Sequence, residues 1–508
     1  MRTINSFKNV ITGIGGNIIT TLLQFVSRTV FINMLGKEYL GIQGLFTNIL
    51  SVLSIAELGI GVAIVFSLYK PLADKDIKKA AATTNFLRKA YFLIGLIIAG
   101  LGMLLIPFLP YIIKGTTNLV NINIIYILYL LQTVSSYWFF AYKGLLLQAD
   151  QKRYIVNMIR YFVTNIAVVF QILALVLSKS FIVYTIIGIA ANICTNLIVA
   201  RKANKMYPDI FKNKNETLPK DEKKEIFKNV FGVSMYKINS IVVRSTDNIV
   251  ISAFVNTVAV GIYSNYHLIV NTLITMAKLI FSSFTASIGN LFVSDDKEKS
   301  EFIFRCLSFF AFWLYGFVAI SLWILFNPFI TLWIGREYLF ADYIVLVIVI
   351  DFIMDGYQQV SITFKDACGL FWRGKYRPLA TAVLNVIISL ILVPRMGVAG
   401  VLLGTIISRL LTTWWFEPWM VYKYAFNKSS KRYFVRYMSF FLLIVLIGGL
   451  VHVACMPFSA NTWFNLVIKA FLCVLIPNSI IFLIFRKTEE FKYLVGAGKK
   501  VTKSVFKK

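Results

Sequence analysis

The first long apolar segment, residues 10–35, limits what this chain can fold into more than any other feature. It can cross a bilayer as one helix, because about 20 apolar residues span the hydrocarbon layer. The segment also contains Arg28, whose guanidinium is costly at membrane depth unless it faces water or a partner. We therefore predict that Arg28 faces an internal, cationic cleft. The alternative is that its long side chain snorkels to the membrane surface.

Thirteen similar segments follow, and together they predict fourteen transmembrane helices. The fourteen segments cover approximately residues 10–35, 41–69, 82–112, 121–147, 154–178, 180–200, 227–255, 258–290, 301–326, 338–364, 377–394, 397–422, 436–456 and 463–485. Only 15% of the residues are charged, against roughly 25% in soluble domains. The expected fold is an all-α integral membrane protein, since barrel strands would instead alternate polar and apolar residues.

Lysine and arginine are distributed unevenly between alternate loops of this predicted topology. If the N-terminus is cytoplasmic, about 38 of them lie in cytoplasmic loops and termini and about five in outer loops. Cytoplasmic loops of membrane proteins carry such an excess, so we expect both termini to be cytoplasmic. The net charge of +29 then reflects membrane orientation, and we expect no nucleic-acid partner.

The longest predicted cytoplasmic loop divides the chain after six spans. A weak repeat crosses it at an offset of 220 residues, which aligns Lys8 with Lys228 and Gly41 with Gly261. Both halves then enter from the cytoplasm, giving a parallel repeat about an axis along the membrane normal. The predicted parts are an N-terminal six-helix lobe (1–200), a cytoplasmic linker (201–226), a C-terminal six-helix lobe (227–422), two extra helices (423–486) and a basic cytoplasmic tail (487–508). The tail either contacts anionic membrane lipids or stays solvated.

Motifs of several enzyme classes are missing from the sequence. It contains no GxxxxGK[ST] P-loop, no GxSxG and no HExxH pattern, and its predicted outer loops are short. Five cysteines are scattered singly and only two histidines could join them, so no metal site, disulfide framework or cofactor is expected. These observations favour transport over enzymatic catalysis. A membrane-embedded glycan polymerase or ligase is the alternative from another class.

Cationic residues inside the predicted spans are the expected substrate-binding groups. They are Arg28, Lys237, Arg244 and Arg409. By the repeat offset, Arg244 falls one helical turn from the equivalent of Arg28, so the two guanidiniums could clamp a phosphate by bidentate bonds. Alternatively, Arg244 pairs with Asp247, three residues later on the same helix face.

Acidic residues in the spans, together with Lys278, are predicted to act in gating or ion coupling. Glu57 and Lys278 fall at nearly equivalent repeat positions, and we predict that they close a gate between the lobes; otherwise Glu57 is a local counter-ion. Asp351 and Asp355 are four residues apart on one helix face, where two carboxylates can share a proton and couple transport to an ion gradient. The alternative is that they neutralise Arg409 or the other arginines.

Residues 35–76 read LGKEYLGIQGLFTNILSVLSIAELGIGVAIVFSLYKPLADKD, and residues 148–154 read QADQKRY. Both stretches resemble the Wzx-type flippases, which export polysaccharide and O-antigen precursors in bacteria. The arrangement of six, six and two spans resembles the wider multidrug/oligosaccharidyl-lipid/polysaccharide (MOP) exporter superfamily. The resemblance implies a bacterial plasma (inner) membrane protein that translocates undecaprenyl-pyrophosphate-linked oligosaccharide by alternating access. It further implies a role in capsule, exopolysaccharide or O-antigen assembly, with polysaccharide polymerases as partners.

Related lipid II flippases add one more expectation. They have a first-span arginine that is thought to hold the substrate in the cleft, and Arg28 matches it. They also carry a second-span arginine, where this chain has Glu57 nearby, so the peptidoglycan precursor is not the expected cargo. The alternative of the same fold is an ion-coupled multidrug or metabolite antiporter. Its cationic cargo would require an acidic cleft, whereas basic residues slightly outnumber acidic ones in the predicted spans.

Overall fold

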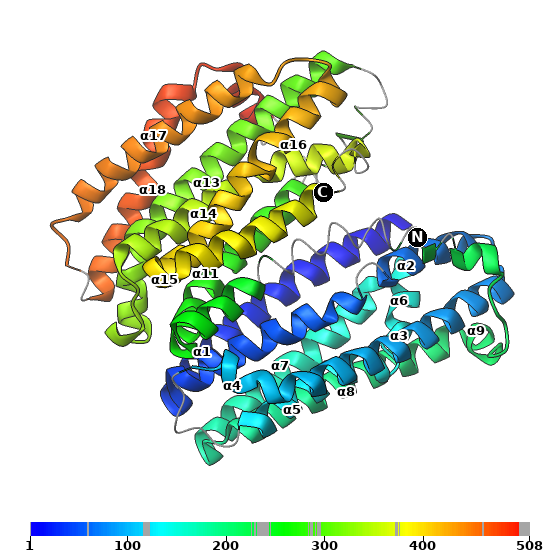
Figure 1. The fold of residues 1–508 in the computed structure, drawn as a ribbon. Helices are drawn as coiled ribbons and strands as arrows, with labels where there is room; N and C mark the ends of the chain where they lie inside the picture. Colours follow the sequence, from blue (N-terminus) through cyan, green and yellow to red (C-terminus); the bar gives the residue numbers. More distant parts are fainter. Residues whose placement is uncertain are drawn as a thin grey trace. The chain divides into compact units, whose positions relative to one another are not determined.

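The computed structural model describes residues 2–57, 60–114, 122–224, 226–227, 230, 243, 245–282, 284, 288–289, 291, 296–370, 374, 376–459 and 462–496. These residues are almost entirely helical and include no strand, which confirms the predicted all-α class (Figure 1). Among them, nine helices are long and apolar enough to cross a membrane, or ten if one bent pair forms a single span. The total of fourteen spans stays a prediction, because segments such as 227–255 lie largely outside the described residues.

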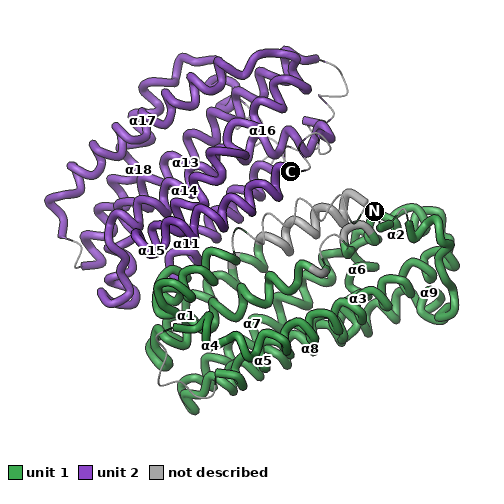
Figure 2. Tube along the Cα trace, in the orientation of Figure 1, with its two compact units in different colours: residues 1–264 green, residues 265–508 purple. Residues whose placement is uncertain are grey.

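The helices fall into two compact units, residues 1–264 and 265–508 (Figure 2). Helix α11 crosses the division. The predicted lobe boundaries, which were drawn from loop lengths and charge, stay a prediction. The helices of residues 1–264 and α11 are α1 (Arg2–Leu53), α2 (Ile60–Ala73), α3 (Ile77–Leu105), α4 (Leu109–Ile112), α5 (Ile122–Trp138), α6 (Tyr142–Ala149), α7 (Arg153–Ser178), α8 (Phe181–Met206), α9 (Pro208–Lys212) and α11 (Thr257–Ser282).

Three helix–helix contacts organise the first unit. Helix α1 packs along α7, and α5 packs against both α3 and α8. Aromatic side chains fill the space between these helices: Phe31 of α1 lies edge-on against Phe181 of α8, with ring centroids 5.7 Å apart. Such ring contacts stabilise the bundle, because edge-to-face aromatic pairs attract each other.

In the second unit, α13 packs against α14, α17 and α18. The two helices predicted to follow the second lobe, α17 and α18, therefore belong to this unit. The helices of residues 265–508 after α11 are α13 (Lys297–Trp333), α14 (Asp342–Ala367), α15 (Arg377–Leu411), α16 (Thr413–Val421), α17 (Lys431–Cys455) and α18 (Trp463–Phe485).

Glycines in the left-handed region mark two short connections between expected spans. Gly36 (φ 80°) interrupts α1 between the segments expected at 10–35 and 41–69, and Gly397 (φ 56°) interrupts α15 between those expected at 377–394 and 397–422. Only glycine adopts this backbone conformation at little cost. The glycine at each position therefore marks the turn in the sequence.

The second expected span, 41–69, is not one continuous helix. A short 3₁₀ turn, Ser54–Glu57, follows α1, and α2 begins at Ile60. The fourth expected span, 121–147, is likewise broken, because α5 and α6 are bent by 47°. Apolar composition alone cannot reveal such breaks, since it is the same on both sides of each break.

Candidate functional site

Arg28 lies on the first arm of α1, before the turn at Gly36. Its Nη1 donates to Oε1 of Gln43 at 3.4 Å, and its Nη2 donates to Oγ of Ser264 at 2.6 Å. Residues 28 and 43 would stand about 22 Å apart along a straight helix at 1.5 Å per residue. The turn at Gly36 therefore folds α1 into a hairpin that brings Gln43 back to the guanidinium. Both of these hydrogen bonds go to neutral oxygens.

A polar cavity of about 190 Å³ lies next to this guanidinium in the first unit. Gln43 belongs both to the cavity wall and to the Arg28 hydrogen bond. The remaining lining residues come from α1, α5, α7 and α8, and they are Thr47, Tyr129, Gln132, Gln171, Tyr184, Thr185 and Gly188. Every described side chain in this lining is uncharged. The cavity can therefore offer hydrogen bonds without attracting an ion, while Arg28 supplies positive charge at its edge.

Glu57 sits in the 3₁₀ turn that breaks the second expected span. Its Oε1 accepts a hydrogen bond from the hydroxyl of Tyr91 at 3.0 Å, and its Oε2 accepts one from Tyr137 at 3.1 Å. These two tyrosines lie on α3 and α5, so the carboxylate ties three parts of the first unit together. The gate between Glu57 and Lys278 stays a prediction. In the structure, each of these two side chains has partners within its own unit.

Lys278, Asp351, Asp355 and Arg409 form one ionic cluster in the second unit. Arg409 Nη1 lies 2.6 Å from Asp351 Oδ1, and its Nη2 lies 3.9 Å from Asp355 Oδ1. Lys278 Nζ lies 3.6 Å from Asp355 Oδ2. The charges of this cluster cancel, because two cations face two carboxylates across α11, α14 and α15. This arrangement corresponds to the alternative interpretation, in which the aspartates neutralise Arg409. Their proposed roles in substrate binding, gating or coupling stay predictions.

Two of the predicted substrate-binding residues, Lys237 and Arg244, lie outside the described residues. Asp247, the alternative partner of Arg244, is described and buried. Of the four predicted cations, the structure therefore places Arg28 in the first unit and Arg409 in the second.

A buried ionic triad in the second unit was not anticipated from the sequence. Glu417 of α16 is 1% exposed, and its Oε1 lies 2.5 Å from Arg377 Nη2 and 3.3 Å from Lys365 Nζ. Arg377 and Lys365 lie at the start of α15 and near the end of α14. The usable signal was Glu417 itself, a lone carboxylate within the apolar run TWWFEPWMV.

A third ionic group forms around Glu490, which follows α18 and lies outside the membrane-spanning helices. Glu490 Oε1 accepts a hydrogen bond from Arg436 Nη1 at 2.8 Å and lies 3.6 Å from Arg305 Nη1. Burial alone would raise the pKa of Glu490, but the hydrogen bond from Arg436 and the charges of both arginines outweigh it, so the pKa is lowered. The segment after α18 is thereby fastened to α13 and α17.

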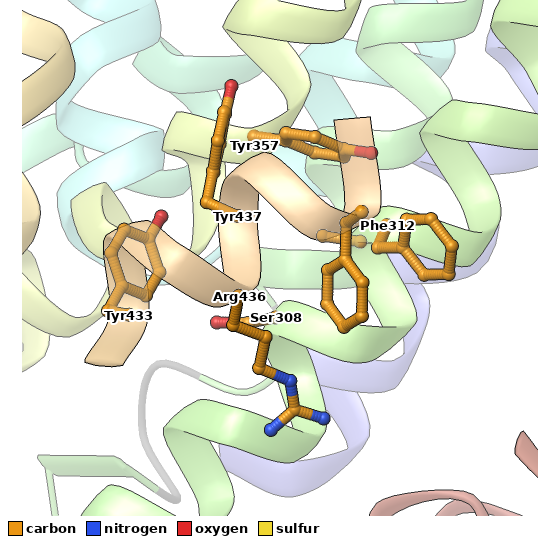
Figure 3. A pocket seen from close by; sticks show the side chains of 8 residues that line it. Ser308, Phe312, Tyr357, Tyr433, Arg436 and Tyr437 are labelled. Atoms are coloured by element: carbon orange, nitrogen blue, oxygen red, sulfur yellow. The ribbon is translucent and has the colours of Figure 1, made fainter. Parts of the chain in front are cut away.

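Figure 3 shows a second, much smaller pocket, close to Arg436. Its volume is about 20 Å³, room for about one water molecule. Tyr357 and Tyr437 meet edge to face in its wall, with ring centroids 4.9 Å apart, and the guanidinium of Arg436 turns away from them. This pocket is too small for any part of a glycan, so the polar cavity of the first unit is the better candidate.

Comparison with known proteins identifies a family and several solved structures of similar fold. A family model described as "Polysaccharide biosynthesis protein" matches residues 6–288. The chain belongs to this family. Among solved structures, it is similar to "Lipid II flippase MurJ, inward closed conformation", with 15% identity, coverage of 94% of this chain and 99% of that one, and a TM-score of 0.67.

Two further solved structures are MATE transporters. One is an inward-facing MATE family transporter of the MOP superfamily, with 15% identity, coverage of 77% and 91%, and a TM-score of 0.64. The other is a mutant of the Vibrio cholerae MATE transporter VcmN, with 12% identity, coverage of 84% and 98%, and a TM-score of 0.53. No curated protein sequence matches the chain significantly. At these identities the similarities show the fold alone, which is like that of the solved flippase and MATE transporters. Together with the family match, this fold confirms the predicted resemblance.

Proposed function

We propose that this protein is a flippase that moves undecaprenyl-pyrophosphate-linked oligosaccharide across the bacterial plasma membrane by alternating access. Membership of the polysaccharide biosynthesis family and a fold like that of a lipid II flippase support a transporter of this kind. One observation carries the choice of cargo: the guanidinium of Arg28 lies at the edge of a polar, uncharged cavity.

The chemistry of this arrangement suits an anionic headgroup that carries sugars. A guanidinium binds phosphate oxygens by paired, charge-assisted hydrogen bonds, which are stronger than neutral ones. Neutral amides and hydroxyls beside it suit the hydroxyl groups of a glycan. A cationic drug would instead be repelled by Arg28, which is why the flippase is preferred to the multidrug antiporter.

The energy source is proposed from the same observations. The sequence has no P-loop pattern, so we propose an ion gradient, the membrane potential or removal of the product as the driving force. Asp351 and Asp355 are the proposed coupling residues, and Glu57 with Lys278 the proposed gate. Both termini are proposed to be cytoplasmic, and the translocated oligosaccharide is proposed to pass to a polysaccharide polymerase.

Transport by proteoliposomes that contain a labelled lipid-linked oligosaccharide tests the proposal. Because hydrogen bonds to charged groups contribute about 1.5–3 kcal/mol, Arg28→Ala should slow translocation by about tenfold or more. Arg28→Lys should retain an intermediate rate, since it keeps the charge but loses the bidentate geometry. Arg160→Ala removes an exposed arginine from α7 and serves as the control.

Two results would reject the flippase. One is a wild-type protein that leaves the lipid-linked oligosaccharide where it was but moves cationic drugs, which would identify an antiporter. The other is an Arg28→Ala variant that transports at the wild-type rate, which would remove the reason for choosing an anionic cargo.

A further inference from the structure

We infer that the polar cavity of the first unit is a subsite for one uncharged pyranose ring, the sugar attached directly to the phosphate of the cargo. The inference rests on the proposed function and adds to it the part of the cargo that this protein recognises and the residues that do so.

The hydrogen-bond donors and acceptors that line the cavity match the hydroxyl groups of a sugar. Gln43, Gln132 and Gln171 each present an amide with both donor and acceptor atoms, and the tyrosine and threonine hydroxyls do the same. A sugar hydroxyl also donates and accepts, so it can be satisfied in either direction by such groups. A lining of carboxylates or amines would have satisfied an ion better.

Two tyrosine rings in the wall are held in fixed orientations. Tyr129 and Tyr184 both stack against Phe181, with ring centroids 6.2 Å and 6.1 Å apart and interplanar angles of 20° and 10°. Aromatic rings with a hydroxyl offer an apolar face and a polar tip. A pyranose has the same two-sided character, with C–H bonds on its faces and hydroxyls around its edge.

Gly188 keeps the cavity open between two of the amides. A Cβ at this position would lie 3.2 Å from Nε2 of Gln132 and 3.3 Å from Nε2 of Gln171. The surrounding helices are fixed by hydrogen bonds that cross them, from Gln171 Nε2 to the Tyr184 carbonyl at 3.0 Å and from Asn192 Nδ2 to the Gln132 carbonyl at 3.3 Å. The space is therefore set by the backbone framework of α5, α7 and α8.

The position of Arg28 determines which part of the ligand reaches the cavity. Because Gln43 both lines the cavity and accepts from Arg28, a phosphate bound to the guanidinium would hold the next group of the ligand at the cavity. A volume of about 190 Å³ is below the roughly 300–1,000 Å³ of sites that enclose drug-sized ligands. One ring fits, and the rest of the oligosaccharide must lie outside the cavity.

Binding to the purified full-length protein in nanodiscs tests the subsite with two probes. One is undecaprenyl pyrophosphate, and the other is the same lipid carrying a single N-acetylhexosamine. The wild-type protein should bind the sugar-bearing lipid more tightly. Gln132→Leu should lose about tenfold in affinity for that lipid, because it removes hydrogen bonds to the ring, and should bind the bare lipid as before.

Gly188→Ala provides an independent variant. Alanine is a better helix former than glycine, so this change narrows the cavity without weakening α8, and it should also reduce binding of the sugar-bearing lipid alone. Gly100→Ala on α3 is the matched control, since a Cβ there meets nothing within 4 Å.

The outcomes separate the two proposals. If wild-type protein binds both lipids equally, or if both variants keep the wild-type ratio of affinities, the subsite is wrong and the flippase stands. If wild-type protein binds neither lipid, the proposed function fails and the subsite fails with it.

Discussion

The backbone nitrogen of Gly41 lies 2.9 Å from the point that a Cβ on residue 261 would occupy. In the other direction, a Cβ on residue 41 would collide with the carbonyl oxygen of Thr257. The second arm of α1 and the start of α11 thus meet backbone to backbone at two glycines 220 residues apart, which is the offset of the internal repeat. The repeat that aligns these two glycines stays a prediction.

The Gly41–Gly261 contact predicts that Gly261→Ala destabilises the protein. The added methyl group must push apart two backbones, and overpacking of this kind costs about 1–3 kcal/mol. Thermal unfolding of the purified protein should show a lower Tm. Gly449→Ala on α17, where a Cβ meets nothing within 4 Å, should leave the Tm unchanged or slightly higher. Equal Tm values for wild type and Gly261→Ala would show that the two helices can separate at no cost.

The buried triad predicts a large effect for Glu417→Gln. Lys365 and Arg377 would lose the carboxylate that both contact, and removing one partner from a buried ionic network costs about 3–5 kcal/mol. A strong loss of Tm and of folded yield is expected. Glu301→Gln is the control, because its pair with Lys428 at 2.5 Å is much more exposed, and such pairs contribute about 0–1 kcal/mol. A Glu417→Gln protein as stable as the Glu301→Gln control would contradict the structural role.

The Glu490 cluster predicts a pH-dependent stability. The pKa of Glu490 is lowered in the folded protein, whereas a glutamate in an unfolded chain has a pKa of about 4.3. Its stabilisation is therefore present above that pH and is lost as the pH falls through the folded pKa. The difference in Tm between wild type and Glu490→Gln should be largest near neutral pH and should shrink below about pH 4. A difference that stays constant down to acid pH would assign the effect to packing alone.

The proposed gate predicts a charge-reversal rescue. Lys278→Glu should slow transport, because it places a third carboxylate beside Asp351 and Asp355 and removes the proposed partner of Glu57. Adding Glu57→Lys should restore part of the rate if the two residues pair during the cycle. Lys278→Gln serves as the control for loss of charge without reversal. Absence of any rescue in the double variant would end the gate hypothesis.

The fold class was predictable because the length of each apolar segment indicates whether it can span a membrane. The turns at Gly36 and Gly397 are each marked by a glycine in the sequence. The break at Ser54–Glu57 was not predictable, since Glu57 is held by tyrosines 34 and 80 residues away. Among the site residues, Arg28 stood out by its charge. The cavity beside it did not, because glutamines and tyrosines on four helices form no pattern along the chain. The Glu417 triad was missed for the same reason: its cations are 40 and 52 residues away.

The left-handed turn at Gly36 sets the angle between the two arms of α1, which belong to the first two expected spans. Arg28 and Gln43 lie on opposite arms of the hairpin, and the Nη1–Oε1 separation of 3.4 Å is already at the long end of a hydrogen bond. Widening of the angle between the arms would lengthen this contact beyond hydrogen-bonding distance. A backbone rotation at Gly36 would therefore change the hydrogen-bond partners that the guanidinium finds within the hairpin.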